Sequence, residues 1–230
     1  IALTHEVLLK IPPLLIATYP EAAEIYQKLA QWVGVSPESL LLTPGSDGAI
    51  RLVFEVFVEH GDDVIHTEPT FAMYSVYSQM FGAKAHTVKY KKTEFGPSLD
   101  PEVILKTLQD KCPKLLCIPN PDSPTGTIIE SEVLRDILKA CEKVGAVLLL
   151  DEAYHPFYKW SAVPWTKTSR NLIVARTFSK AWGVAGFRIG YAVAHPETIA
   201  LLHKIRPMYE VSTLAVEFMS RMLNETSEME

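Results

Sequence analysis

The stretch FSKAWGVAGFRIGY, residues 178–191, holds a lysine and an arginine eight positions apart in an otherwise apolar, glycine-containing segment. Charged side chains are seldom buried unless they have a partner or a chemical task. A lysine amine that is held partly out of water can act as a nucleophile toward a carbonyl group. The segment therefore indicates either a solvated loop or a half-buried Lys180 that is held for chemistry, with Ser179 beside it and the guanidinium of Arg188 available for an anion.

Further polar and aromatic residues follow short apolar runs. Asp151 ends the run AVLLLD, and Tyr154 comes three residues later. An acid at the end of an apolar strand is partly buried and needs a cationic partner to stay ionised. A helix cap or a structural ion pair would explain Asp151 equally well.

Three other loops add to this set. In PGSDGAIRL, Ser46 and Asp47 can cap a helix whose free N–H groups form an anion site. Phe71 and Tyr74 in EPTFAMY offer aromatic faces on a strand-to-helix loop, although core packing would explain both of them too. Ser123 lies in the turn-rich loop NPDSPTG.

Together these loop residues offer the groups that a single cofactor needs. A lysine for a Schiff base, an aspartate for a pyridinium nitrogen, an aromatic face for a ring, and an arginine, a serine and a helix N-terminus for a phosphate are what pyridoxal 5'-phosphate requires. The set therefore predicts this cofactor, with Lys180 as its covalent attachment point.

The elements that must position these residues follow from hydrophobic periodicity. Amphipathic patterns predict helices over residues 46–60 and 130–145. Apolar runs predict strands at 62–67, 83–88, 114–119, 146–151, 171–176 and 188–194. Several of these runs are apolar on both faces, which is typical of interior strands in a mostly parallel sheet covered by helices. The class is therefore α/β, and ligands are expected beyond the carboxyl ends of the strands.

Composition narrows the classes of function. The 230 residues are 48% hydrophobic and carry a net charge of -5 with scattered lysines, which gives no footprint for nucleic acid. No apolar run approaches the length of a membrane span. The three cysteines lack zinc or disulfide spacing, and the histidines show no paired metal spacing. We expect a cytoplasmic protein with no metal.

The motifs SPTG, DEAY and SKAWGVAGFRIGY, in this order and spacing, resemble the fold-type I pyridoxal-phosphate aminotransferases, and most of all the histidinol-phosphate aminotransferase-like group. The resemblance runs from about Tyr19 to about residue 220. It implies a three-layer α/β/α fold with a mostly parallel mixed sheet. It also implies an N-terminal segment (1–20), a cofactor-binding large domain (21–215) and the start of a link to a small domain (216–230), so that we expect a fragment.

The resemblance also implies residue roles. Lys180 forms the Schiff base and moves the proton, and Asp151 partners the pyridine nitrogen. Tyr154 bonds the ring oxygen, and Phe71 stacks on the ring.

The resemblance also implies which residues bind the phosphate: four from the same chain and one from another subunit. Ser179, Arg188 and the backbone amides around Ser46 and Asp47 would hold it within one chain. Tyr19 resembles the tyrosine that reaches the phosphate of the neighbouring subunit, which implies a homodimer.

Two departures from the family pattern bear on activity. Ser123 stands where the family has an asparagine that bonds the ring oxygen, and Asn120 would compensate only in a rearranged loop. This departure favours a divergent relative. The family's substrate-binding arginine belongs to the small domain, so we expect the chain as given to turn over slowly or not at all.

The implied function is transfer of an amino group between an amino acid or amino-alcohol phosphate and a 2-oxo acid. In the histidine-pathway interpretation the pair is histidinol phosphate and 2-oxoglutarate. Two alternatives stay open: a decarboxylase of a phosphorylated amino acid that uses the same cofactor, and a truncated, non-catalytic domain of the same fold that serves for dimerisation.

Overall fold

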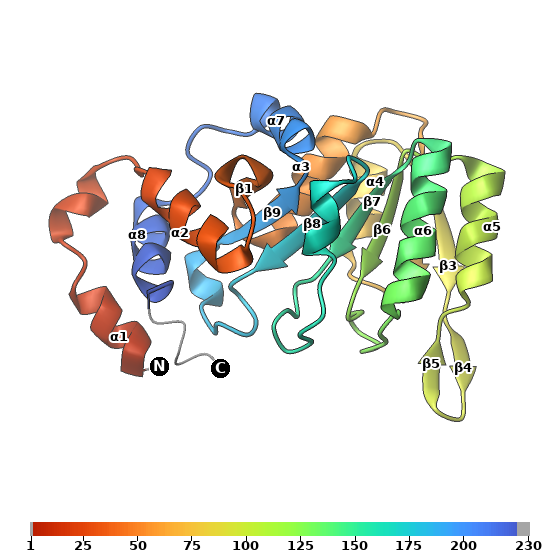
Figure 1. Cartoon of the computed structure of the whole chain (residues 1–230), viewed down its shortest axis with the longest axis horizontal. Coiled ribbons are helices and arrows are strands. Elements are labelled where there is room, and N and C mark those ends of the chain that lie inside the picture. Colours follow the sequence, from red (N-terminus) through yellow and green to blue (C-terminus); the bar gives the residue numbers. More distant parts are fainter. Residues whose placement is uncertain (1, 225–230) are drawn as a thin grey trace.

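A computed structural model describes residues 2–224 of the chain (Figure 1). Its central feature is a seven-stranded sheet of strand order β1-β9-β8-β7-β6-β2-β3. The strands are β1 (Leu40–Thr43), β2 (Asp63–Glu68), β3 (Lys84–Lys89), β6 (Leu115–Pro119), β7 (Val147–Asp151), β8 (Leu172–Thr177) and β9 (Gly190–Ala194). The strands from β3 to β8 pair in parallel, whereas β9 is antiparallel to both β8 and β1. The predicted mostly parallel mixed sheet is confirmed.

Helices cover both faces of the sheet and make the three layers. On one face, side chains of α1, α2, α5, α6 and α8 share a buried cluster with the sheet, and on the other α3, α4 and α7 do so. Their bounds are α1 (Ala2–Leu9), α2 (Ala23–Val33), α3 (Gly45–Phe57), α4 (Met73–Met80), α5 (Pro101–Lys111), α6 (Ser131–Val144), α7 (Pro196–Ile205) and α8 (Thr213–Met222). A small hairpin, β4 (Lys91–Thr93) and β5 (Gly96–Ser98), projects from the sheet (Figure 1).

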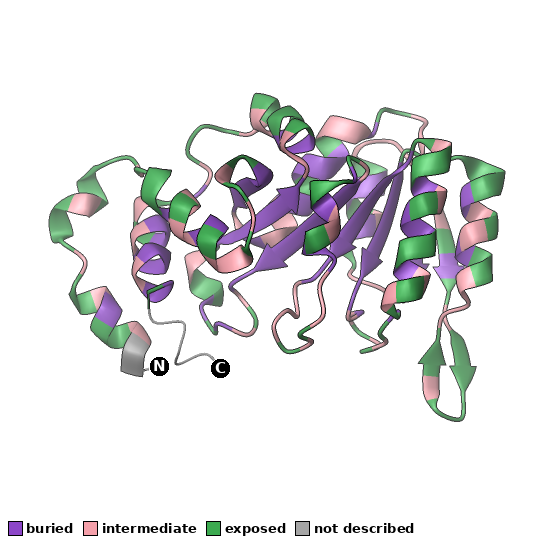
Figure 2. Cartoon of the chain, viewed as in Figure 1, coloured by how far each residue is buried: buried purple, intermediate pink, exposed green. Residues whose placement is uncertain are grey.

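The central strands are buried because they lie between the two helical layers. Every residue of β6, β7 and β8 is buried (Figure 2), as the continuous apolar runs predict. The expected helix over 130–145 is α6, which places Leu134, Ile137 and Cys141 on the sheet and ends at Gly145 in the left-handed region. Periodicity therefore predicts the core-facing side of this helix.

The connection between β8 and β9 carries the lysine and the arginine. Because β9 runs antiparallel to β8, residues 178–189 leave and re-enter the sheet at the same edge. The strand expected at 188–194 begins only at Gly190, since Arg188 has a positive φ of 50° and turns the chain. This loop therefore lies at the carboxyl end of β8, and in open α/β sheets ligands bind at the carboxyl ends of the parallel strands.

The C-terminal helix belongs to the same packed layer. The expected boundary at residue 215 falls inside α8, where Val216, Phe218 and Met219 are buried in the cluster that also contains residues of α2. Residues 225–230 of the expected link lie outside the described residues, so the division into domains stays a prediction. Within residues 2–224, no helix combines the length and apolarity that crossing a membrane requires.

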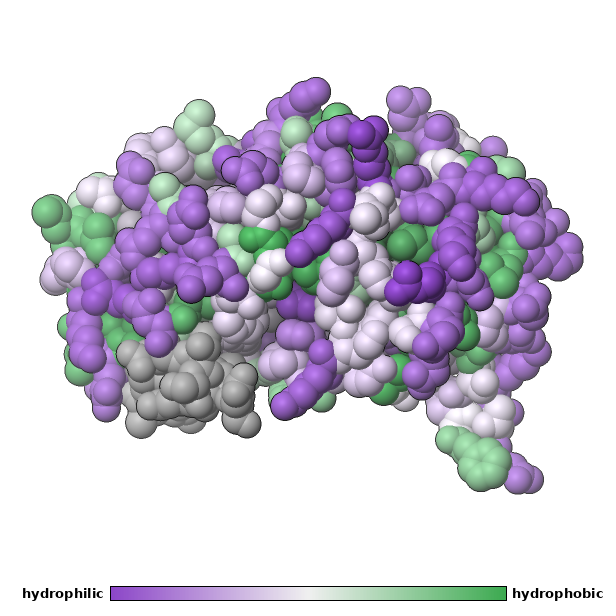
Figure 3. All heavy atoms as spheres, viewed as in Figure 1, coloured by the Kyte–Doolittle hydropathy of each residue, from purple (hydrophilic) through white to green (hydrophobic). Residues whose placement is uncertain are grey.

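Some exposed apolar side chains lie at one end of the molecule. Hydrophilic side chains cover most of the face in Figure 3, and apolar ones are scattered among them, some of them at the end where α1 and the following 3-10 turn lie. The exposed apolar residues there are Leu9, Leu14 and Ile16. Three exposed apolar side chains within eight residues give this end a surface that could be buried against another protein.

Candidate active site

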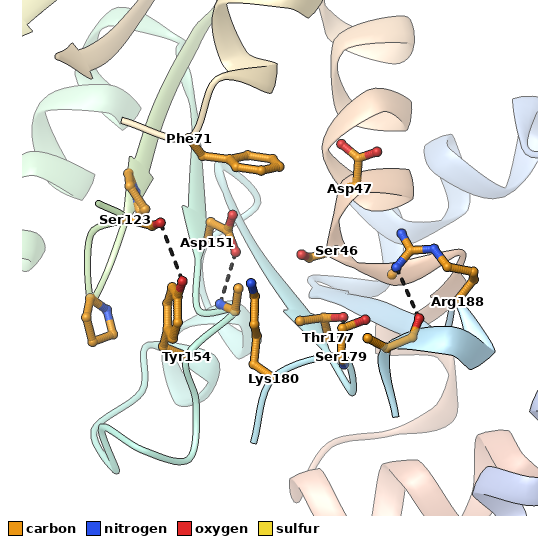
Figure 4. Close-up of a pocket in the computed structure, with 15 residues that line it drawn as sticks. Ser46, Asp47, Phe71, Ser123, Asp151, Tyr154, Thr177, Ser179, Lys180 and Arg188 are labelled. Atoms are coloured by element: carbon orange, nitrogen blue, oxygen red, sulfur yellow. Dashed lines mark hydrogen bonds between the residues drawn. The ribbon is translucent and has the colours of Figure 1, made fainter. Parts of the chain in front are cut away.

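A cavity of about 260 Å³ opens beyond the carboxyl ends of β6, β7 and β8, against the start of α3 (Figure 4). Nine of the ten residues that the sequence singles out line it: Ser46, Asp47, Phe71, Ser123, Asp151, Tyr154, Ser179, Lys180 and Arg188. Their segments are far apart in the sequence, and the parallel sheet brings them to one edge.

The start of α3 forms one end of the cavity. The expectation that Ser46 or Asp47 caps this helix is wrong: α3 begins at Gly45, its N-cap is Pro44, and no side chain caps it. Both side chains lie in the first turn instead and line the cavity, and the Asp47 carboxylate accepts a hydrogen bond from Tyr77 at 3.0 Å. The free N–H groups of the first turn therefore remain available for an anion.

Two glycines, Gly45 and Gly190, leave this end of the cavity free of side chains that would fill it. A Cβ on Gly190 would lie 2.6 Å from the carbonyl carbon of Gly45, so only glycine lets β9 approach the start of α3 so closely. Gly45 itself has a φ of +76°, and a Cβ there would lie 3.1 Å from a guanidinium nitrogen of Arg188. Backbone and guanidinium thus converge at the helix start without a side chain between them.

Two polar side chains at this end have donors to spare. The Oγ of Ser179 is buried without a hydrogen-bond partner, although its backbone N–H donates to the Thr177 hydroxyl at 3.1 Å. The Arg188 guanidinium makes only long bonds, to the carbonyls of Pro44 at 3.5 Å and Ala185 at 3.4 Å. A buried hydroxyl without a partner is costly, so this end of the cavity suits an anionic group with several oxygens.

Asp151 forms the inner wall of the cavity. Its Oδ2 accepts a bond from the Tyr74 hydroxyl at 3.0 Å, and its Oδ1 accepts one from the Ala153 N–H at 3.0 Å. Burial raises the pKa of this carboxyl to about 6, in spite of both bonds. Within the described part of the chain it forms no salt bridge, so none of the described residues is the cationic partner that the sequence predicts.

Aromatic residues flank the space in front of Asp151. Both Phe71 and Tyr154 line the cavity, and in Figure 4 Tyr154 stands beside Lys180 while the Phe71 ring lies above them. The Lys180 amine lies 5.4 Å from the centre of the Tyr154 ring, and the Tyr154 hydroxyl donates to Ser123 Oγ at 3.4 Å. The two hydroxyls thus lie side by side in the cavity, and the replacement of the family's asparagine by Ser123 stays a prediction.

One expectation about side-chain environment is corrected, and the loop rearrangement that the Asn120 alternative requires is not seen among the described residues. Lys180 is exposed rather than half-buried, because Phe178 and Trp182 take the buried positions of the loop while Lys180 points into the open cavity. Asn120 cannot take over the role of the asparagine, because its amide bonds the backbone N–H and carbonyl of Ile129.

Tyr19 is the predicted site residue that the structure leaves apart from the cavity. Its side chain is 72% exposed and stacks on Tyr209, with ring centres 4.2 Å apart. Its role stays a prediction. Thr177 is a site residue that the sequence did not single out, whereas the sequence indicates Tyr74 beside Phe71 as an aromatic that core packing would also explain. Thr177 is the last residue of β8, directly before the lysine loop, whereas nothing in the sequence separates Tyr74 from ordinary aromatic core.

The cavity therefore has two chemically different ends, with the aromatic side chains of Phe71 and Tyr154 between them. One end offers helix N–H groups, a free hydroxyl and a guanidinium, and the other offers a buried carboxyl without a cation. A ligand that fits both has an anionic group with several oxygens, a flat ring beside Phe71 and an N–H that faces Asp151. The Lys180 amine lies within the same cavity and can attack a carbonyl carbon of such a ligand.

Comparisons with known proteins point to one family. The family described as aminotransferase class I and II matches residues 8–230. A histidinol-phosphate aminotransferase of Caldanaerobacter subterraneus subsp. tengcongensis is 36% identical over 196 residues, which are 85% of this chain and 54% of that protein. One from Ruminiclostridium cellulolyticum is 34% identical over 213 residues, which are 91% of this chain and 58% of that protein.

A solved structure agrees with these relatives. The histidinol-phosphate aminotransferase of Sinorhizobium meliloti, determined in complex with pyridoxal-5'-phosphate, superposes with a TM-score of 0.88 at 26% identity, over 98% of this chain and 61% of that one. The chain thus spans about half to three fifths of the length of these relatives.

Proposed function

The chain belongs to the class I and II aminotransferase family, and on that premise we propose that its cavity binds pyridoxal 5'-phosphate and that the whole protein transfers amino groups. The observation that carries the proposal is the pair of unlike ends in one cavity. The phosphate fits the start of α3 with the free Ser179 hydroxyl, and a protonated ring nitrogen is the cation that the buried Asp151 lacks.

When bound, pyridoxal phosphate supplies an electron-withdrawing ring that stabilises negative charge at the substrate α-carbon. Asp151 accepts the N–H of the ring nitrogen and, as a carboxylate, keeps that nitrogen protonated. Phe71 lies against the face of the ring. Tyr154 and Ser123 present hydroxyls to the ring oxygen. The Lys180 amine would hold the cofactor covalently and, as a free amine, would serve as the base that takes the proton from the substrate α-carbon.

The proposed substrates are an amino acid or an amino-alcohol phosphate as donor and a 2-oxo acid as acceptor. The histidinol phosphate and 2-oxoglutarate pair is supported by the names of the two relatives at 36% and 34% identity. Neither the decarboxylase nor the non-catalytic alternative is favoured, since both relatives are named as aminotransferases.

We further propose that the protein is a homodimer in the cytoplasm. Exposed Leu14, Ile16 and Tyr19 at one end of the molecule support a subunit contact there. Unpaired Cys112, Cys117 and Cys141 agree with a reducing compartment.

Lys180→Ala tests the proposal directly. The chain is mixed with pyridoxal phosphate, its visible absorption is recorded before and after borohydride reduction, and the reduced adduct is mapped to a peptide. We expect a reducible adduct at Lys180 in the unchanged chain and complete loss of that adduct in Lys180→Ala. Lys167→Ala, which removes an exposed lysine outside this cavity, is the matched control. An adduct that persists in Lys180→Ala would overturn the proposal, as would the absence of any adduct in the unchanged chain.

A further inference from the structure

We propose that Tyr74 is a positioning residue of this site, whose hydroxyl holds the Asp151 carboxylate in the orientation that meets the ring nitrogen of the cofactor. The inference rests on the proposed function and adds a residue to it. Tyr74 lies outside the cavity lining, behind the carboxyl group that it contacts.

The contact fixes the carboxylate from both sides. The Tyr74 hydroxyl donates to Oδ2 from α4, and the Ala153 N–H donates to Oδ1 from the loop after β7, each at 3.0 Å. Rotation of the carboxyl group would break both bonds at once. With Ala153 alone, one oxygen would stay free to turn away from the cavity, so the second donor determines the plane of the group.

The Tyr74 ring is itself held in place. It is fully buried, and its edge meets the Phe71 ring with centres 5.7 Å apart and planes at 82°. The Ser78 hydroxyl donates to the Tyr74 carbonyl at 2.8 Å, which ties the residue to the next turn of α4. One side chain therefore supports both the aromatic wall and the acid of the site, which gives a single residue control over two cofactor contacts.

The chemistry of a phenol suits this place. Burial and the nearby Asp151 raise the pKa of Tyr74 well above its ordinary value, so the hydroxyl remains a donor. The other titratable groups that face Asp151 are Asp47 on α3, Glu152 on the same loop and the buried thiol of Cys117 on β6. The two carboxylates oppose ionisation of Asp151, and the bonds from Tyr74 and Ala153 favour it. The hydrogen bond from Tyr74 thus favours the ionised form of Asp151, which is the form that binds a cationic partner.

Tyr74→Phe separates this role from core packing, because it keeps the ring and removes only the hydroxyl. We expect its dissociation constant for pyridoxal phosphate at pH 8 to rise about tenfold, the size of effect that loss of one hydrogen bond to a charged group produces. The carboxyl ¹³C resonance of Asp151, assigned with Asp151→Asn, should titrate at a higher pH in the cofactor-free Tyr74→Phe chain than in the unchanged chain.

Tyr26→Phe is the matched control. It removes the bond of another, half-buried phenol, which the Leu42 N–H donates to the Tyr26 hydroxyl at 3.0 Å, and Leu42 lies on β1, three strands away from Asp151 in the sheet. Neither the dissociation constant nor the Asp151 midpoint should change. If Tyr74→Phe leaves both quantities as in the unchanged chain, the positioning role is wrong.

Two further arms keep the outcomes separate. If the unchanged chain fails to bind the cofactor, the proposed function fails, while the Asp151 midpoint still tests the Tyr74 contact. If Tyr74→Phe does not fold, 3-fluorotyrosine at position 74 replaces it. That ring fits the same space and is a stronger donor, so the Asp151 midpoint should fall, and an unchanged midpoint would overturn the inference.

Discussion

Asp151 and Glu152 are neighbours at the end of β7, and both are buried, with 5% and 1% of their surface exposed. Their hydrogen-bond and ion-pair partners differ: Glu152 has a cationic partner and Asp151 has none among the described residues. The Glu152 carboxylate pairs with Arg176 at 2.8 Å and also accepts bonds from Ser161 Oγ and the Ala162 N–H. The Asp151 carboxyl has two neutral donors, no cation, and a cavity in front of it.

The difference separates a structural group from a ligand-binding one. Both carboxylates lose their hydration on folding, which costs several kcal/mol unless the charge is matched. The fold offsets this cost for Glu152 through Arg176, whereas the raised pKa of Asp151 shows that its cost remains. A buried charge left without its counterion beside an open cavity is a place where a ligand can supply the counterion.

Breaking the matched side of the pair should have the largest effect on stability. Glu152→Gln leaves the buried Arg176 guanidinium without its counterion, and we expect the free energy of unfolding to fall by about 4 kcal/mol. Urea denaturation at pH 7 measures this. The exposed pair of Lys106 and Asp110 is the control, and Asp110→Asn there should cost only about 0.5 kcal/mol. Equal effects of the two changes would remove the distinction between Glu152 and an ordinary surface acid.

Replacing the Asp151 carboxyl by an amide should raise the free energy of unfolding, whereas the same replacement at Glu152 lowers it. The folded cofactor-free chain keeps the Asp151 proton up to about pH 6, whereas the unfolded chain releases it near pH 4. This group's contribution to stability therefore falls as the pH rises between those values, by about 3 kcal/mol in all. Asp151→Asn cannot ionise, so we expect it to match the unchanged chain at pH 4 and to exceed its stability by about 3 kcal/mol at pH 8.

The pH series also shows how this prediction would fail. Urea denaturation of both chains is measured at pH 4, 6 and 8, and only the difference between them is used, which cancels the other titrating groups. A difference that does not change with pH would show that Asp151 is not an unmatched buried acid. In the whole protein, Asp151→Asn should keep the covalent adduct and lose most of the transfer activity.

This contrast between neighbours is the part that the sequence does not reveal. Burial of both acids follows from the apolar run before them, and the strand ends, the lysine loop and nine of the site residues follow from local patterns. Which carboxyl finds a cation depends on Arg176, 24 residues away from Glu152 on the next strand. Side-chain pairing across strands is a property of register, and one sequence does not determine it.

The remaining differences have equally specific causes. Side-chain capping of α3 was expected from residue types, yet α3 begins at Gly45, close to Gly190 of β9, and no side chain caps it. The burial of Lys180 was expected from its apolar neighbours, which pack inward and leave it pointing into the cavity. Both differences lie at the site itself, where backbone placement rather than local preference decides the geometry.

The smallest expected effect sharpens the comparison at the other end of the cavity. Ser179 Oγ is buried without a partner, as Asp151 is buried without a cation, so Ser179→Ala should stabilise the cofactor-free chain by about 1 kcal/mol. Ser161→Ala is the matched control, because the Ser161 hydroxyl bonds both Glu152 and Arg176, and its loss should destabilise the chain by a similar amount. Thermal unfolding of the two variants gives the signs. Ser179→Ala should also bind pyridoxal phosphate less tightly, because the phosphate loses a donor. A variant that gains stability and loses affinity together would show that this hydroxyl is held for a ligand, whereas a loss of stability would place it among the structural groups with Glu152.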